Sequence, residues 1–124
     1  MKTQTVTFFT DKEEEFANLL TEIGTKRSVA AVLVFLANVT EATSRDIERG
    51  TDLRQPEVSI AMKYMIAQGW IASTETKGEN KGRPHKVYRL AVPIAKIMNQ
   101  IEREKKEEAQ NQLALVKRIR EYAG

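Results

Sequence analysis

A chain of 124 residues, 41% of them hydrophobic, can form one compact domain with a modest core, and it is too short to enclose a deep substrate cavity as well. It contains no cysteine, which excludes disulfides, zinc–thiolate sites and thiol redox sensing. The net charge of +3 is mild, no apolar run follows Met1 as in a secretory signal, and no stretch reaches the roughly 20 apolar residues of a membrane span, so we expect a cytoplasmic protein without membrane contact.

The first part of the chain predicts an N-terminal arm followed by two helices. Residues 2–10 are rich in threonine and fit an edge strand or an ordered arm. Thr10 and Glu13 match a capping box, which starts a helix, and Gly24 suits its end because glycine tolerates the left-handed conformation. The next helix, from about residue 26 to 38, has a wide apolar stripe, so we expect it to be the most buried one.

Two shorter helices are then predicted around a tight turn. Thr43 and Asp46 match a second capping box, and the helix that it starts is expected to end at Gly50. Pro56 suits the first turn of the following helix, which we place at residues 55–68. Its expected buried face comprises Val58, Met62, Met65 and Ile66. Such a pair is typical of a helix-turn-helix, although an ordinary helical hairpin fits the same pattern.

A basic β-hairpin is predicted directly after these helices. Residues 70–77 and 85–92 have the composition of strands, and the glycine-containing segment between them fits a turn. Residues 75–89 hold five basic and two acidic side chains, an excess equal to the net charge of +3 of the whole chain. Because residues 43–69 hold four basic and four acidic side chains, we expect the hairpin to make most of the electrostatic contact with phosphates.

Two segments carry the pattern of a known group of proteins. Residues 58–71 begin with a Val-Ser pair, continue with apolar residues at helical spacing, and end in glycine followed by two apolar residues. Gly82-Arg83-Pro84 precedes the segment Tyr88-Arg89-Leu90-Ala91-Val92-Pro93. Together these segments resemble the recognition helix and wing of ArsR-, MarR- and archaeal TrmB-like winged-helix transcriptional regulators. The resemblance implies a winged helix-turn-helix with double-stranded DNA as its partner.

Two departures from these relatives leave the response to ligands open. TrmB-like proteins carry a sugar-binding domain after a coiled segment, whereas this sequence stops at Gly124, so we expect no effector domain. Metal-sensing ArsR-like proteins use cysteine or clustered histidine and carboxylate ligands, whereas this chain has a single histidine, His85. We therefore predict no metal and no cofactor, and a small-molecule effector stays undefined.

We expect the helix at residues 55–68 to enter the major groove of DNA. There Gln55 can pair with adenine, Arg54 with guanine, and Ile60 can contact a thymine methyl group. Arg83 in the hairpin turn is the expected minor-groove contact. The full set of predicted DNA-contacting residues is Arg54, Gln55, Glu57, Ser59, Ile60, Lys63, Lys81, Arg83, Lys86, Lys26, Arg27, Ser44 and Arg45.

The last segment predicts one long helix. Between Ile94 and Gly124 there is no proline or glycine, and about thirty helical residues span about 45 Å. Heptad spacing gives a coiled-coil seam that is polar in its middle, where Lys105 is expected to pair with Glu108 of a partner. A helix folded back on its own domain fits the same pattern. The predicted dimerisation residues are Ile94, Met98, Ile101, Leu115, Ile119 and Tyr122.

These elements predict a mainly α protein with a small β-hairpin wing. We expect residues 1–92 to form a DNA-binding winged helix-turn-helix with an N-terminal extension, and residues 93–124 to form a dimerisation helix. Nucleophile elbows, phosphate loops and paired carboxylates are absent from the sequence, so an enzyme is not predicted. The expected function is transcription regulation by a homodimer. Alternatively, the same fold serves as a protein–protein module, with Ile60 and Tyr64 as anchors.

Replacement of both Lys81 and Arg83 by alanine should weaken binding to every duplex, because the hairpin turn holds the excess of positive charge. The slope of log affinity against log salt should fall by about one to two units, while thermal unfolding stays unchanged. Fluorescence anisotropy over a series of salt concentrations measures the slope. A slope equal to that of the parent protein would show that the turn does not contact DNA.

Overall fold

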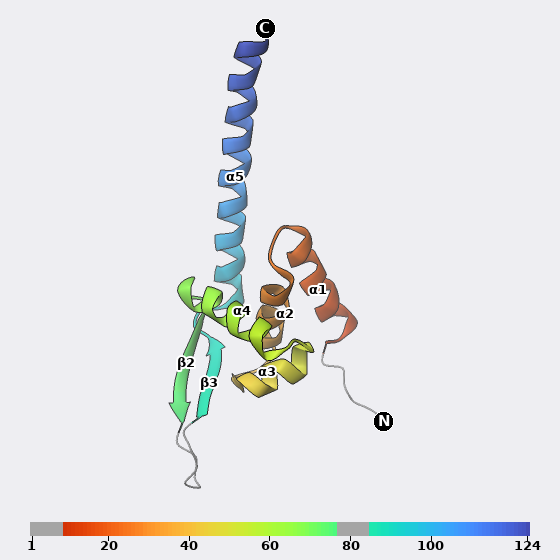
Figure 1. Ribbon diagram of the computed structural model, residues 1–124, viewed down its shortest axis with the longest axis vertical. Helices are drawn as coiled ribbons and strands as arrows, with labels where there is room; N and C mark the ends of the chain where they lie inside the picture. The colour runs from red at the N-terminus through yellow and green to blue at the C-terminus, as the bar shows by residue number, and fades with distance from the viewer. Residues whose placement is uncertain (1–8, 77–84) are drawn as a thin grey trace. The chain divides into compact units, whose positions relative to one another are not determined.

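The computed structural model describes residues 9–76 and 85–124, and the chain divides after Val92 into two compact units (Figure 1). The first unit contains α1 (Asp11–Glu22), α2 (Arg27–Ala37), β1 (Ala42–Thr43), α3 (Ser44–Thr51), α4 (Gln55–Ala67), β2 (Ile71–Thr76) and β3 (His85–Leu90). The second unit is the helix α5 (Ile94–Ala123). The predicted fold class, a winged helix-turn-helix followed by a long helix, is confirmed.

Capping boxes start α1 and α3, as predicted. The N–H of Thr10 donates to Glu13 Oε1 at 2.9 Å, and the N–H of Glu13 donates to Thr10 Oγ1 at 3.2 Å. Thr43 and Asp46 repeat this exchange at 3.0 and 3.1 Å. Each exchange satisfies two backbone N–H groups that a helix start leaves without partners. The N-terminal arm predicted at residues 2–10 lies mostly outside the described residues.

The core of the first unit is built around α2. This helix contacts α1, α3, α4 and β3, so it is the element on which the other helices pack. It buries six residues, more than any other described helix, and most of them are fully enclosed. The buried residues of α2 are Val29, Ala30, Val32, Leu33, Val34 and Leu36. The prediction that this helix is the most buried one is therefore confirmed.

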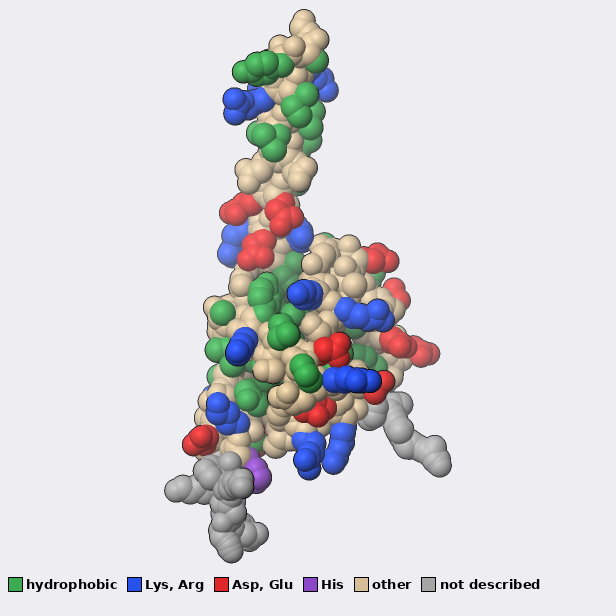
Figure 2. Space-filling view, viewed as in Figure 1, with side chains coloured by type: hydrophobic (Ala, Val, Ile, Leu, Met, Phe, Trp, Pro, Cys, Tyr) green, Lys and Arg blue, Asp and Glu red, His purple; other side chains and the backbone are tan. Residues whose placement is uncertain are grey.

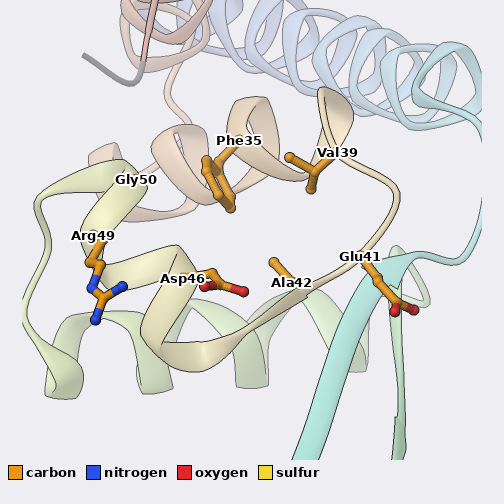
Figure 3. Close-up of a pocket in the computed structure, with 7 residues that line it drawn as sticks. All are labelled: Phe35, Val39, Glu41, Ala42, Asp46, Arg49 and Gly50. Carbon is orange, nitrogen blue, oxygen red and sulfur yellow. The ribbon is translucent and has the colours of Figure 1, made fainter. Parts of the chain in front are cut away.

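Gly50 has a different role from the predicted one. The helix α3 continues past it to Thr51, and Asp52 ends the helix in the left-handed conformation at φ 61°. Gly50 is buried, and the ring of Phe35 occupies the place of the missing side chain: a Cβ built there would lie 2.6 Å from Phe35 Cδ1. Figure 3 shows Phe35 projecting from α2 toward α3. Glycine at this position therefore allows close approach of the two helices.

The wing is a three-stranded antiparallel sheet rather than a hairpin alone. Its strand order is β1-β3-β2, with Ala42 opposite Tyr88 and Ile71 opposite Leu90. The strand β1 was not predicted, because two residues are too short to display the alternation that marks a strand. Trp70, only 3% exposed, precedes β2, and its carbonyl accepts a hydrogen bond from the N–H of Ala91 at 2.7 Å.

The second unit is a continuous helix, as predicted. Two of its residues, Ile97 and Ile101, are buried, and the first of these was not part of the predicted seam. Lys105 Nζ lies 3.2 Å from Glu108 Oε1 of the same helix, so in the single chain this pair forms within α5 rather than with a partner. Among residues 9–76 and 85–124, no helix combines the length and the apolarity that a membrane crossing requires.

Substitution of Gly50 by alanine should destabilise the protein by about 1–3 kcal/mol, because the added methyl group overlaps the half-buried ring of Phe35. Urea unfolding measures the loss. The double variant Gly50→Ala/Phe35→Leu should lose less than the sum of the two single variants, since the smaller side chain makes room for the methyl group. Additive losses would contradict a direct contact between Phe35 and residue 50.

Candidate nucleic-acid interface

The helix α4 is held in place by its buried face. Val58, Ala61, Met62 and Met65 are each at most 5% exposed, and α4 contacts α2, α3 and β2. The prediction that Ile66 belongs to this face was wrong, since its side chain is 47% exposed. At about 100° per residue, Ile66 lies about 80° around the helix from Val58, at the edge of the buried arc.

The opposite face of α4 is free to contact a partner. Glu57, Ile60, Lys63 and Tyr64 are exposed on it, and Ile60 is 61% exposed although it is apolar. Ser59 lies at the border of this face and is partly buried. A face with a cation, a carboxylate, a hydroxyl and an apolar side chain has the donors, acceptors and methyl groups needed to read base edges. We call these five residues the outward face of α4; Gln55, the exposed first residue of the helix, lies on the same side of it as Ile66.

The start of α4 is stabilised by Glu57, one of the predicted DNA-contacting residues. Arg54 is the N-cap residue, and its backbone N–H donates to Glu57 Oε1 at 2.9 Å. Gln55, the first helical residue, is exposed beside them. The carboxylate of Glu57 therefore stabilises the helix start, where negative charge is favoured by the helix dipole.

A helix start without such a carboxylate occurs at α2. Lys26 is its N-cap, no side chain caps it, and its first turn contains no acidic residue. Lys26 and Arg27 are both exposed there. The first turn of α2 therefore combines two cations with backbone N–H groups, which is a favourable arrangement for an anion.

The remaining predicted cations are distributed over the first unit. Arg45 and Arg49 are exposed one helical turn apart on α3, whereas Ser44 is partly buried. Figure 2 shows Lys and Arg side chains at the edge of the first unit beside α3, and acidic side chains gathered over α1. Lys26 and Arg27 start α2, about 16 Å along its axis from the end that leads to β1 and α3. The structure thus separates these two residues from Ser44 and Arg45.

The described part of the wing carries two exposed cations on β3, Lys86 and Arg89. Lys86 is exposed on β3, but Glu75 of β2 lies directly opposite it in the sheet register. Lys81 and Arg83 lie outside the described residues. His85 is exposed at the start of β3, and among the described residues no three His, Cys, Asp or Glu side chains come close enough together to hold a metal ion.

An aromatic contact joins α4 to the residue before β2, and no sequence pattern predicts it. The rings of Tyr64 and Trp70 meet edge to face, with centroids 5.8 Å apart and an interplanar angle of 87°. Tyr64 is still 45% exposed, so one part of the ring is supported and the other is available. Gly69 adopts φ 79° and turns the chain directly after α4. This turn places Trp70 beside Tyr64.

A shallow pocket of about 280 Å³ lies between the end of α2, the segment before β1, and α3 (Figure 3). Phe35 and Val39 line it from α2 and the residues that follow, and the charged side chains of Glu41, Asp46 and Arg49 stand at its sides. The carboxylate of Asp46 is already bonded to the backbone of Thr43. Phe35 and Gly50, which lie in contact, both line the pocket.

Comparison with known proteins agrees with this geometry. The model of the MarR family matches residues 23–80, which include α2, α3, α4 and β2. A search of curated proteins finds no match. The fold is similar to that of TrmBL2, an archaeal chromatin protein, with a TM-score of 0.65 at 16% identity. That comparison covers 88% of this chain but only 39% of TrmBL2, so the likeness concerns less than half of the larger protein.

Two further solved structures have the same fold. A possible transcriptional regulator from Methanosarcina mazei Go1 gives a TM-score of 0.57 at 11% identity, covering 77% of this chain and 82% of its own. A MarR family regulator from Neisseria meningitidis gives 0.52 at 20% identity, covering 81% and 68%. The chain therefore resembles winged-helix transcriptional regulators of the MarR and TrmBL2 type, and it has their DNA-binding fold.

Proposed function

We propose that this chain is a transcription regulator that binds specific double-stranded DNA as a homodimer, with α4 in the major groove. The observation that carries the proposal is the outward face of α4, which presents polar and apolar side chains on a helix fixed from behind by four buried residues. A rigid helix of this kind fits the width of the major groove.

The side chains divide into base readers and phosphate anchors. Gln55 can make two hydrogen bonds to adenine, Arg54 can do so with guanine, and Ile60 supplies an apolar contact for a thymine methyl group. Lys63, farther along the exposed face, is suited to a phosphate. Residues of the wing and of α3 add the remaining backbone contacts: Lys81, Arg83 and Lys86, and Ser44, Arg45 and Arg49.

The helix-turn-helix is nearly neutral, which favours specific over general affinity. Two of its carboxylates, Asp46 and Glu57, accept hydrogen bonds at the starts of α3 and α4. These two carboxylates reduce the attraction of the starts of α3 and α4 for phosphate. The uncapped start of α2, with Lys26 and Arg27, can attract a phosphate instead. Binding should therefore depend on base contacts more than in a strongly basic protein.

The homodimer is proposed from the surface of α5. Leu115, Ile119 and Tyr122 are 56%, 64% and 85% exposed and follow one another at heptad spacing. Soluble proteins rarely leave a contiguous apolar stripe uncovered, and a second copy of the same helix can cover it. Two recognition helices related by two-fold symmetry would read a near-palindromic operator with half-sites about one helical turn apart.

A second candidate function is a protein–protein module, and one observation favours it. Ile60, Tyr64 and Ile66 are all large, apolar or aromatic, and at least 45% exposed on α4. Such residues can anchor a protein interface. Retention on random duplex DNA that falls as salt rises would support the DNA-binding function, whereas no retention at low salt would favour the protein module.

Gln55→Ala should weaken binding to the preferred duplex by about 1–3 kcal/mol and have much less effect on random duplexes, because it removes a base contact and no phosphate contact. The preferred duplex is first obtained by selection from random sequences, and anisotropy gives both affinities. The matched control is Gln110→Ala on the exposed surface of α5, which should change neither affinity. Equal losses of Gln55→Ala on both duplexes would mean that Gln55 reads no base.

Ile119→Asp should convert the dimer into a monomer, because it places a charge in the apolar stripe of α5. The matched control is Leu113→Asp: Leu113 is 68% exposed and lies outside the heptad seam, so this variant should stay dimeric. Sedimentation of both variants at micromolar concentration measures the change, and the monomer should bind only half-sites weakly. Monomeric behaviour of the parent protein would contradict the homodimer.

A further inference from the structure

The middle of α5 carries a charge pattern that is complementary to itself when the helix is reversed. Lys105 and Lys106 are followed by Glu107 and Glu108, so the sequence read backward with inverted charges is unchanged. The four side chains lie on the surface of the helix, and three of them form exposed pairs within it: Lys105 with Glu108 at 3.2 Å, and Lys106 with Glu102 at 3.5 Å. These charges are thus available to a second helix.

From this pattern, and resting on the homodimer proposed above, we infer that two copies of α5 pack antiparallel, with the two-fold axis between Lys106 and Glu107. In this register Lys105 of each copy lies in the seam opposite Glu108 of the other, whereas Lys106 and Glu107 lie on the outer surface of the pair. A two-fold axis repeats every contact, so the centre gains two Lys105–Glu108 pairs. On dimer formation, Lys105 and Glu108 can give up their pair within one helix and each pair with the other helix, so that neither charge loses a partner.

The same register matches the apolar ends of the seam. Leu115 of one copy meets Met98 of the other, and Ile119 meets Ile94. Leu115 and Ile119 are more than half exposed, while Met98 and Ile94 retain part of their exposure. Met98 and Ile94 of one helix therefore cover Leu115 and Ile119 of its copy, the buried Ile101 lies at the level of Gln112, and the polar centre covers itself.

A parallel arrangement does not satisfy the central charges. In the same heptad frame Lys105 would face Lys105, and Glu108 would face Glu108, so each layer would hold two like charges. Because exposed pairs contribute little each, the charge pattern mainly sets the direction of packing, while the apolar ends supply most of the association.

The direction of packing also sets a distance. In the antiparallel register the two Ile94 residues lie about 38 Å apart along the rod, because 25 residues separate their levels at about 1.5 Å each. One turn of DNA is about 34–36 Å long. The attachment points of the two winged units would then be spaced like two half-sites, whereas in a parallel pair they would lie side by side.

Spin labels can test the direction, since the chain has no native cysteine. Gln110→Cys and Lys117→Cys place labels seven residues apart at the same outward heptad position. Antiparallel packing separates the two copies' labels by about 10 Å along the axis at residue 110 and about 32 Å at residue 117. The measured distance should therefore be longer at residue 117 by roughly 10–15 Å. Equal distances at both sites would overturn the antiparallel arrangement and leave the homodimer intact, whereas no dipolar coupling at either site would overturn both.

Charge variants test the cause. Lys105→Glu should weaken self-association at least tenfold, because both central layers of the seam then hold two carboxylates. Exchange of the seam pair, by adding Glu108→Lys, restores the complementarity and should restore the parent affinity. Sedimentation of the full chain measures each value, and circular dichroism checks that α5 stays helical. A Lys105→Glu variant that associates like the parent protein would overturn the role of the central charges.

Discussion

The burial of α2 is the constraint on which the first unit depends. With six buried residues, this short helix has too little polar surface to lie anywhere but inside, so α1, α3, α4 and β3 must cover it. Its Phe35 reaches the backbone of α3 at Gly50, which fixes how closely α3 can approach. The helix α4 then packs on both α2 and α3, and its outward face is set by what the other face must bury. The proposed recognition surface is thus determined by the core.

The charges of the first unit are divided between structure and recognition. Carboxylates at the starts of α1, α3 and α4 accept backbone hydrogen bonds, which stabilises those helices. Those of α3 and α4 also count among the four acidic side chains that balance the four basic ones of residues 43–69. As a result the helix-turn-helix has little net charge, and its exposed apolar residues become a larger part of its chemistry. This balance is consistent with a surface that discriminates between partners rather than one that attracts any polyanion.

Local rules allowed most of the fold to be predicted from the sequence. The capping boxes at Thr10 and Thr43, the apolar stripe of α2 and the unbroken run of α5 each involve neighbouring residues, so a pattern identifies them. The missed features depend on contacts across the fold. The strand β1 forms because β3 lies beside it, and residue 50 is a glycine that leaves room for the ring of Phe35. Ile66 was misplaced because residues at the edge of a helical stripe are buried or exposed according to their neighbours. For the candidate site, helix geometry predicted most of the exposed face of α4. Residue spacing predicted neither the hydrogen bond of Glu57 to the backbone of Arg54 nor the contact between the rings of Tyr64 and Trp70.

The contact between Tyr64 and Trp70 has an optical consequence. Trp70 is the single tryptophan of the chain, and it is buried at the junction of α4 and β2, with its ring 5.8 Å from a tyrosine of the proposed recognition helix. Ultraviolet emission from the protein therefore comes mainly from one indole with a known neighbour. The native molecule carries its own fluorophore at the point where the helix meets the wing, and occupancy of that surface can be followed without attaching a dye.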